Sequence, residues 1–205
     1  GAVISFLGGG IADGAQGPDI SAIPAIALKK VEVLRDGAAA QYGSDAIAGI
    51  LNFVYKDAAE GYRLEIKSGE YKEGDGQTVR IGMNAGMPFT DDGYANFSLE
   101  LQETDPTARS AQRGDAASLK AAGVPVWEHP FGNGEAQVWG SPKVKDDVKF
   151  VGNIGLELTP SSKFYLFGNY AEKNVMGGFF FRNPNNRTGV YDDGSDIRLI
   201  ADVAQ

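Results

Sequence analysis

The chain has 205 residues, and its 28 glycines represent about twice the average usage of globular proteins. It has no cysteine and one histidine, which excludes disulfides, thiolate metal sites, cysteine nucleophiles and the two-histidine zinc motif. The formal net charge of −8 is opposite in sign to the charge that phosphate-backbone binding requires, so the composition excludes nucleic acid as a partner.

The first 57 residues differ in kind from the rest of the chain. Two strand-like segments, residues 29–35 (KKVEVLR) and 50–56 (ILNFVYK), flank a stretch rich in alanine and glycine. This pattern predicts a compact mixed α/β piece, with residues 58–61 as the linker to the remainder of the chain. The N-terminus shows neither the basic region nor the cleavage site of a signal peptide, so we expect it to lie inside a longer protein.

From Tyr62 onward, apolar and polar residues alternate at every second position in segments separated by turns or loops. Ala95, Phe97, Leu99 and Leu101, for example, alternate with Asn96, Ser98, Glu100 and Gln102. Such alternation predicts half-buried antiparallel strands. The predicted strands span residues 62–67, 78–85, 95–102, 148–158 and 164–171. In the fourth strand, Lys149, Asn153 and Glu157 lie on the face opposite the apolar residues. The fifth strand is apolar on both faces in its first half, so the sequence does not decide which face is buried.

The predicted connections are short at one end of the strands and long at the other, where residues 104–147 form a very long loop. Outer-membrane barrels combine short periplasmic turns with long outer loops, and no apolar run here is long enough for a membrane-spanning helix. Aromatic residues near the strand ends are placed as two interfacial girdles would be, although aromatic residues favour strands in general. They are Tyr62, Phe89, Tyr94, Phe164 and Tyr165 on the short-turn side, and Tyr71 and Tyr170 on the other.

Residues 23–57 (IPAIALKKVEVLRDGAAAQYGSDAIAGILNFVYKD) closely resemble the C-terminal part of the plug domain of TonB-dependent outer-membrane receptors. The resemblance includes the strand ending in Arg35, the turn AQYGS at 40–44, the small-residue segment AIAG at 46–49 and the following strand with Asn52. The commonest family form has Gly-Pro after the arginine, where this chain has Asp-Gly, which leaves the local turn geometry in doubt.

The fold that the resemblance implies is a mixed α/β plug segment followed by antiparallel transmembrane β-strands. The plug segment would be residues 1–57, and residues 58–205 would form the first barrel strands with their outer loops. The family barrel has about 22 strands around a plugged lumen, so we expect this chain to be a fragment. An open sheet edge in lipid is not viable, which favours the same interpretation.

The resemblance also implies a function, namely TonB-dependent import of a scarce solute across the Gram-negative outer membrane. The ligand would bind at outer loops and plug, and energy-coupled plug movement would come next, with no enzyme activity and no cofactor. The implied partners are TonB and its inner-membrane energising complex, reached through an upstream segment absent here, together with an unknown small solute and outer-membrane lipid. The alternative is a soluble all-β carbohydrate-binding module whose aromatic loops form the site.

Three residues of the plug segment are singled out as candidate site residues. Arg35 ends an apolar strand, where a buried unpaired guanidinium would be costly, so we expect it to meet carboxylates. The resemblance implies that it locks the plug to the barrel wall, and a solvated strand-end arginine is the alternative. Gly43 and Gly49 are expected to allow close packing of backbone against backbone.

The long loop carries both tryptophans and the only histidine. Because members of the family contact their ligands through plug apices and outer loops, often with aromatic residues, Trp127, His129 and Trp139 are candidate ligand-binding residues. The alternative is that they only pack the loop. Within this loop, Asp115 is predicted to cap a short helix that is followed by Gly123.

No metal site is predicted. The segment Asp192 to Asp196 (DDGSD) has the acidic, glycine-containing composition of a calcium loop. It lacks the EF-hand spacing and the terminal glutamate, so a solvated acidic turn is the preferred interpretation.

Overall fold

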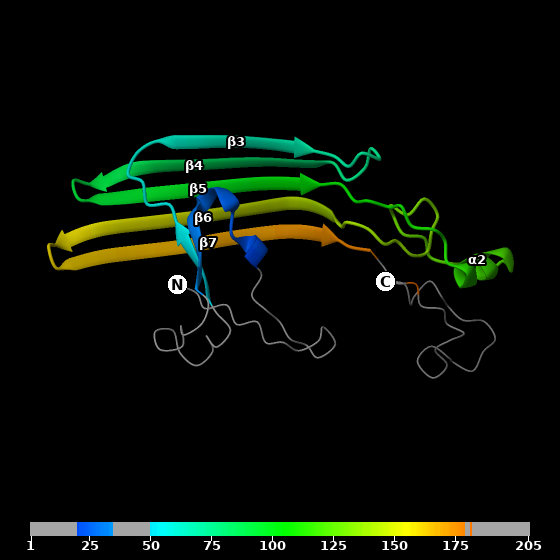
Figure 1. Cartoon of the computed structure of the whole chain (residues 1–205). Helices are drawn as coiled ribbons and strands as arrows, with labels where there is room; N and C mark the ends of the chain where they lie inside the picture. The colour runs from blue at the N-terminus through cyan, green and yellow to red at the C-terminus, as the bar shows by residue number, and fades with distance from the viewer. Residues whose placement is uncertain (1–19, 35–49, 179–180, 182–205) are drawn as a thin grey trace. The chain divides into compact units, whose positions relative to one another are not determined.

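The computed structural model describes residues 20–34, 50–178 and 181. In this part of the chain the strands form a two-stranded sheet, β1-β2, and a five-stranded sheet in the order β3-β4-β5-β6-β7 (Figure 1). The chain divides into two compact units. One comprises Gly1–Lys67, Arg80–Gln102 and Asp146–Lys173, and the other comprises Ser68–Val79, Glu103–Lys145 and Asn174–Gln205. No helix among the described residues is long and apolar enough to cross a membrane.

The N-terminal segment contains two short 3-10 turns, η2 (Ile20–Ala22) and η3 (Ala25–Ala27), and the strands β1 (Leu28–Leu34) and β2 (Ile50–Tyr55). The strands pair antiparallel, with Val31 opposite Phe53. β-Branched and aromatic residues of this kind favour pairing in strands. The two strand-like segments expected from the sequence are therefore confirmed, while the alanine- and glycine-rich stretch between them lies outside the described residues.

All five strands predicted after residue 61 are present. They are β3 (Tyr62–Gly69), β4 (Thr78–Thr90), β5 (Gly93–Thr104), β6 (Lys143–Thr159) and β7 (Ser162–Met176). β6 begins five residues earlier than predicted, because its first residues are mostly charged and Asp146 has a left-handed φ of 53°, which interrupts the alternation. The order of the described strands runs from edge strand β3 to edge strand β7, so these strands form an open sheet.

The connections confirm the predicted alternation of short and long loops. Residues 91–92 and 160–161 form tight turns at one end of the sheet, whereas residues 70–77 and 105–142 connect strands at the other (Figure 1). The connection from β2 to β3 spans residues 56–61 and so begins two residues before the linker expected at 58–61. From here on we call residues 56–61 the linker. Because β3, β4 and their neighbours alternate in direction, the linker enters the sheet at the tight-turn end.

The two faces of the sheet differ in kind. On one face lie apolar side chains that are exposed, including Leu64, Ile66 and Leu158. On the other lie polar side chains that are buried, including Asn96 and Asn153. We call the first the outer face and the second the inner face, because the linker contacts the second. The predicted alternation is therefore confirmed, with the polar residues on the buried side.

The long loop contains the helix α2 (Gly114–Ala121). Its N-cap is Arg113 and not Asp115, so that part of the prediction is wrong. Asp115 lies in the first turn, where its Oδ1 accepts a hydrogen bond from the Ala116 backbone N–H at 2.9 Å and where a carboxylate suits the helix dipole. Gly123 follows the helix with a φ of 77°, as a C-terminal glycine should.

Candidate functional site

The inner face carries a continuous set of buried polar side chains on three neighbouring strands. These residues are Asn84 on β4, Asn96, Ser98 and Glu100 on β5, and Asp147, Lys149 and Asn153 on β6. Buried polar groups are costly unless they are hydrogen-bonded. The hydrogen-bond and ion-pair partners of each side chain therefore show which groups this face can bind.

Three of these residues form a buried ionic cluster. Lys149 Nζ lies 3.1 Å from Glu100 Oε1 and 3.2 Å from Asp147 Oδ2, and each of the three side chains is less than a tenth exposed. One cation between two carboxylates leaves a formal charge of −1. Asp147 Oδ1 is buried without a hydrogen-bond partner in the part of the chain that the structure describes. Removal of Lys149 would leave two buried carboxylates facing each other.

A second cluster, next to the linker, consists of the hydrogen-bonded side chains of Asn84, Asn96 and Ser98. Asn84 Nδ2 donates to Asn96 Oδ1 at 2.6 Å and to Ser98 Oγ at 2.9 Å. The oxygen of the Asn96 amide is thus occupied within the sheet, which turns its nitrogen away from Asn84. The cluster therefore orients Asn96 for a contact outside the sheet.

That contact is with the linker. Asn96 Nδ2 donates to the Ala58 carbonyl oxygen at 3.2 Å, and Asn153 Nδ2 donates to the Lys56 carbonyl oxygen at 2.8 Å. The linker approaches β4 equally closely, because Gly86 N–H donates to the Gly61 carbonyl at 2.9 Å. A Cβ on Gly86 would collide with the Ala58 carbonyl, so this approach requires glycine.

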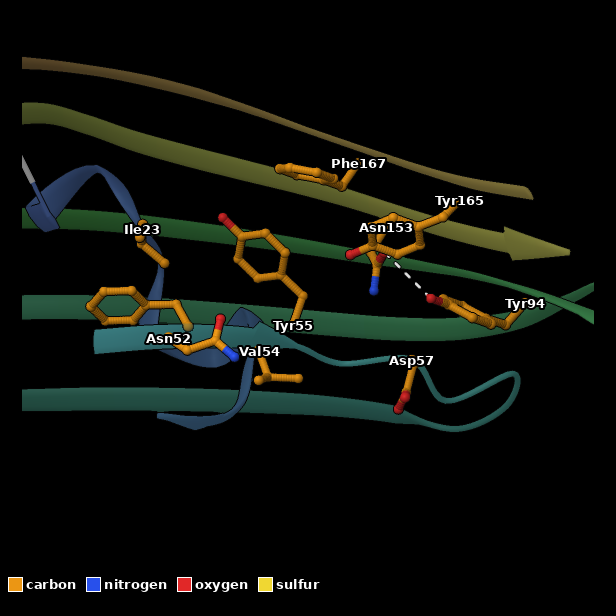
Figure 2. Close-up of a pocket in the computed structure, with 10 residues that line it drawn as sticks. Ile23, Asn52, Val54, Tyr55, Asp57, Tyr94, Asn153, Tyr165 and Phe167 are labelled. Carbon is orange, nitrogen blue, oxygen red and sulfur yellow. Dashed lines mark hydrogen bonds between the residues drawn. The ribbon is translucent and has the colours of Figure 1, made fainter. Parts of the chain in front are cut away.

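A cavity of about 370 Å³ lies between β2 and the inner face (Figure 2). The cavity is lined by the aromatic side chains of Tyr55, Tyr94, Tyr165 and Phe167 and by polar side chains such as that of Asn153. Figure 2 shows the Tyr94 hydroxyl directed to Asn153 Oδ1, at 3.5 Å. Tyr94 and Tyr165 therefore face the cavity, and their assignment to an outward-facing aromatic girdle is wrong.

Burial alters the titration of the N-terminal segment beside this cavity. Desolvation raises the pKa of the Tyr55 hydroxyl, and the nearby Tyr165 raises it further. Burial is also the main cause that lowers the pKa of Lys56, followed by the positive charge of Arg63. Tyr55 is thus an uncharged hydrogen-bonding group at neutral pH.

The loop residues singled out from the sequence differ in their burial and contacts. Trp127 and Phe131 pack against the His129 ring with centroid distances of 5.4 and 4.1 Å, and His129 Nε2 lies 3.0 Å from the Gly177 carbonyl oxygen. His129 is buried, and its Nδ1 has no hydrogen-bond partner among the described residues. Trp139 is mostly exposed and receives a hydrogen bond at its backbone from Ser110. The structure brings the rings of Trp127 and His129 into contact.

A second contact secures this loop. Arg109 binds Asp75 through two hydrogen bonds of 2.8 and 2.9 Å and lies over the Tyr71 ring at 5.4 Å. The pKa of Arg109 is raised, first by the hydrogen bond to Asp75 and further by its charge and that of Glu73. The guanidinium therefore joins the long loop to the β3–β4 connection.

The other candidate site residues, Arg35, Gly43 and Gly49, lie outside the described residues, as does the acidic segment 192–196. Within the described residues no three His, Cys, Asp or Glu side chains cluster as a metal site would. Sequence reasoning placed Asn96 and Asn153 on the polar side of their strands but did not identify them as site residues. The feature that could have identified them is that both are asparagines at polar positions of the alternation, on neighbouring strands.

Comparisons with known proteins agree with this arrangement. Residues 6–50 match the family model of the TonB-dependent receptor plug domain. The comparison with curated proteins finds no match. Among solved structures, the chain is similar to a mutant of the ferric enterobactin receptor of Pseudomonas aeruginosa (PfeA) in complex with enterobactin. That likeness has a TM-score of 0.54 and 19% identity, and it covers 75% of this chain and 21% of that receptor. The fold is therefore shared, and the resemblance to TonB-dependent receptors is confirmed.

Proposed function

We propose, from the plug-domain match and the shared receptor fold, that this chain is the plug-to-wall segment of a TonB-dependent receptor that imports a solute across the Gram-negative outer membrane. The ligand binds at outer loops and plug, and TonB, energised from the inner membrane, then moves the plug. The chain spans 21% of the length of the solved receptor, and the remaining strands would complete a barrel of about 22. No step of this mechanism requires covalent chemistry.

The observation that carries the proposal is the arrangement of the five-stranded sheet around the linker. Its outer face exposes apolar side chains, as a lipid-facing surface does, while its inner face holds polar groups that contact the linker. A barrel wall around a plug needs this distribution. We refer below to the five-stranded sheet as the wall and to the N-terminal segment as the plug segment.

The alternative of a soluble carbohydrate-binding module fits these faces poorly. Leu64, Ile66 and Leu158 are each 60% or more exposed on the outer face. Soluble monomers seldom expose a contiguous apolar surface of this kind without a partner. The wall interpretation supplies that partner as lipid.

The long loop is proposed to contribute ligand contacts through Trp127, His129 and Trp139. Trp139 is the most accessible of these in the structure, whereas His129 is buried. We therefore expect Trp139→Ala to weaken uptake by raising the half-saturating solute concentration without destabilising the loop. The matched control is Phe131→Ala, which removes a ring packed on His129 and should loosen the loop while it leaves the three proposed ligand residues in place.

The test of the proposed function uses the full-length receptor in a Gram-negative host from which the native gene has been deleted. The probes are a panel of radioiron-loaded siderophores, starting with ferric enterobactin, and cobalamin. We expect the protein in the outer-membrane fraction, and uptake of at least one probe that disappears in a strain lacking TonB. A full-length protein recovered in the soluble periplasmic fraction, or uptake unaffected by loss of TonB, would overturn the proposal.

A further inference from the structure

We infer that the wall fixes the linker end of the plug through the side-chain amides of Asn96 and Asn153. This end then stays in place while the upstream part of the plug moves. The two asparagines are positioning residues, because they touch the plug backbone and not the solute. The inference rests on the proposed function for plug movement, whereas the contacts themselves are independent of it.

The two amides have the burial and the partners that an anchor needs. Asn96 and Asn153 are each 2% exposed and lie on the neighbouring strands β5 and β6. Their Nδ2 atoms donate to two linker carbonyls separated by one residue, those of Ala58 and Lys56. The donor amides are buried, whereas Lys56 is half-buried and Ala58 is exposed, so separation mainly leaves each buried amide without a partner.

The wall also prepares both amides for this contact. Asn96 Oδ1 accepts from Asn84 at 2.6 Å, and Asn153 Oδ1 faces the Tyr94 hydroxyl at 3.5 Å. Each asparagine thus directs its oxygen to a donor within the wall and its nitrogen to the linker. A rigid, pre-oriented donor loses less side-chain entropy on binding than a free one.

A third wall donor continues the same pattern. The Gly86 backbone N–H donates to the Gly61 carbonyl at 2.9 Å, so the carbonyls of Lys56, Ala58 and Gly61 all accept from the wall. A contact farther upstream, from Lys173 Nζ to Ser21 Oγ at 2.6 Å, is exposed, where water competes with it. The hydrogen bonds that a buried side chain of the sheet donates to the plug therefore gather at the linker.

These contacts create an asymmetry between the two partners. The acceptors are backbone carbonyls, which every residue type provides, whereas the donors are two specific side chains. Substitution of Lys56 or Ala58 should leave the anchor in place, provided that the new residue fits. Substitution of Asn96 or Asn153 should remove it.

The test measures hydrogen exchange of peptides covering residues 56–61 in the full-length receptor. Asn96→Ala and Asn153→Ala should each raise local opening about fivefold to tenfold, as expected for loss of one partly buried hydrogen bond. Val151→Ala is the matched wall control, because Val151 is equally buried, 2% exposed, on the inner face of β6 and has no side-chain group that could bind the linker. Lys56→Gln is the matched linker control, and both controls should exchange as the wild type does.

Folding of each variant is checked first by its heat-dependent migration in gel electrophoresis. Asn153→Asp is a second variant at this position, which keeps the side-chain shape but replaces the donating amide with a carboxylate. Exchange at 56–61 that is the same in wild type, Asn96→Ala, Asn153→Ala and Asn153→Asp would overturn the inference. Because this measurement needs no solute and no TonB, its failure is distinguishable from loss of TonB-dependent uptake, which bears on the proposed function alone.

The fixed end is tested in cells whose uptake depends on TonB. The chain has no cysteine, so Ala58→Cys introduces a single thiol into it. We expect its labelling by a maleimide to proceed at the same rate in energised cells and in cells treated with a protonophore, while a thiol introduced upstream, Ile20→Cys, reports movement of the plug. Faster labelling of Ala58→Cys on energisation would overturn the inference.

Discussion

The two faces of the wall place opposite kinds of residue in contact with their surroundings. On the outer face, Leu64 and Ile66 are 60% and 66% exposed, whereas on the inner face Asn96 and Glu100 are 2% and 4% exposed. A half-buried sheet in water has the reverse distribution, with apolar residues inside. Alternation alone therefore predicts the strand but not the solvent on each side of it.

The inner face is stable only because its polar groups have partners. Lys149 lies between Glu100 and Asp147, and the amides of Asn96 and Asn153 reach the linker. The outer face needs no such pairing, since its apolar side chains have no hydrogen-bonding groups to satisfy. Substitutions that introduce a charge, or remove the partner of one, should therefore change the free energy of unfolding differently on the two faces.

The largest effect is expected on the inner face from Lys149→Met. This change leaves Glu100 and Asp147 buried without their cation, which costs about 3–5 kcal/mol in comparable buried pairs. The measurement is the free energy of unfolding of the full-length receptor in lipid vesicles, from urea titration.

The control for this prediction neutralises the whole cluster. The triple variant Lys149→Met, Glu100→Gln, Asp147→Asn removes all three charges and should recover most of the lost stability, because no buried charge remains unpaired. If Lys149→Met alone were as stable as the wild type, the carboxylates of Glu100 and Asp147 would be solvated in the receptor. That result would contradict the buried character of the inner face.

A charge on the outer face should have the next largest effect. Leu99 lies in the middle of β5 on the outer face. In the proposed lipid-facing wall, Leu99→Arg places a cation at the depth of the lipid core and should cost about 2–4 kcal/mol. Phe89→Arg is the matched control near the tight-turn end of β4, where the cost should be about 0–1 kcal/mol. Equal costs at the two positions in the same urea titration would argue against a lipid-facing surface.

The sequence was sufficient to predict the strands and much less informative about the site. Alternation in segments such as 95–102 is a local property, and it correctly located five strands and the polar phase that carries Asn96 and Asn153. It could not show which polar residues meet the linker, because the contact between Asn153 and Lys56 joins residues far apart in the chain.

Local patterns also failed where a residue has two competing roles. Tyr94 and Tyr165 were expected in an aromatic girdle from their place near strand ends, but their side chains face the cavity beside Tyr55. Asp115 fits a helix cap by type, yet it pairs with Arg113 in the first turn instead. Position along a strand or helix was predictable in these cases, and the partner was not.

The smallest effect is expected from an ion pair in the plug segment that is exposed to water. The pKa of Glu32 is lowered from the ordinary 4.5, first by a hydrogen bond from Lys30 and then by one from Asn52, whose Nδ2 lies 2.8 Å from Glu32 Oε2. Because the folded-state pKa is depressed, this contribution to stability is present above the ordinary carboxyl pKa and is lost as the pH falls through the folded-state value. Asn52→Ala should therefore raise the pKa of Glu32 toward its ordinary value, as measured by carboxyl-carbon NMR titration with Glu32→Gln to assign the signal. An unchanged pKa in Asn52→Ala would contradict the role of Asn52. If Asn52→Ala lowered the free energy of unfolding as much as Lys149→Met does, the difference in solvent exposure between the two sites would not explain the energetic cost of losing a charge partner.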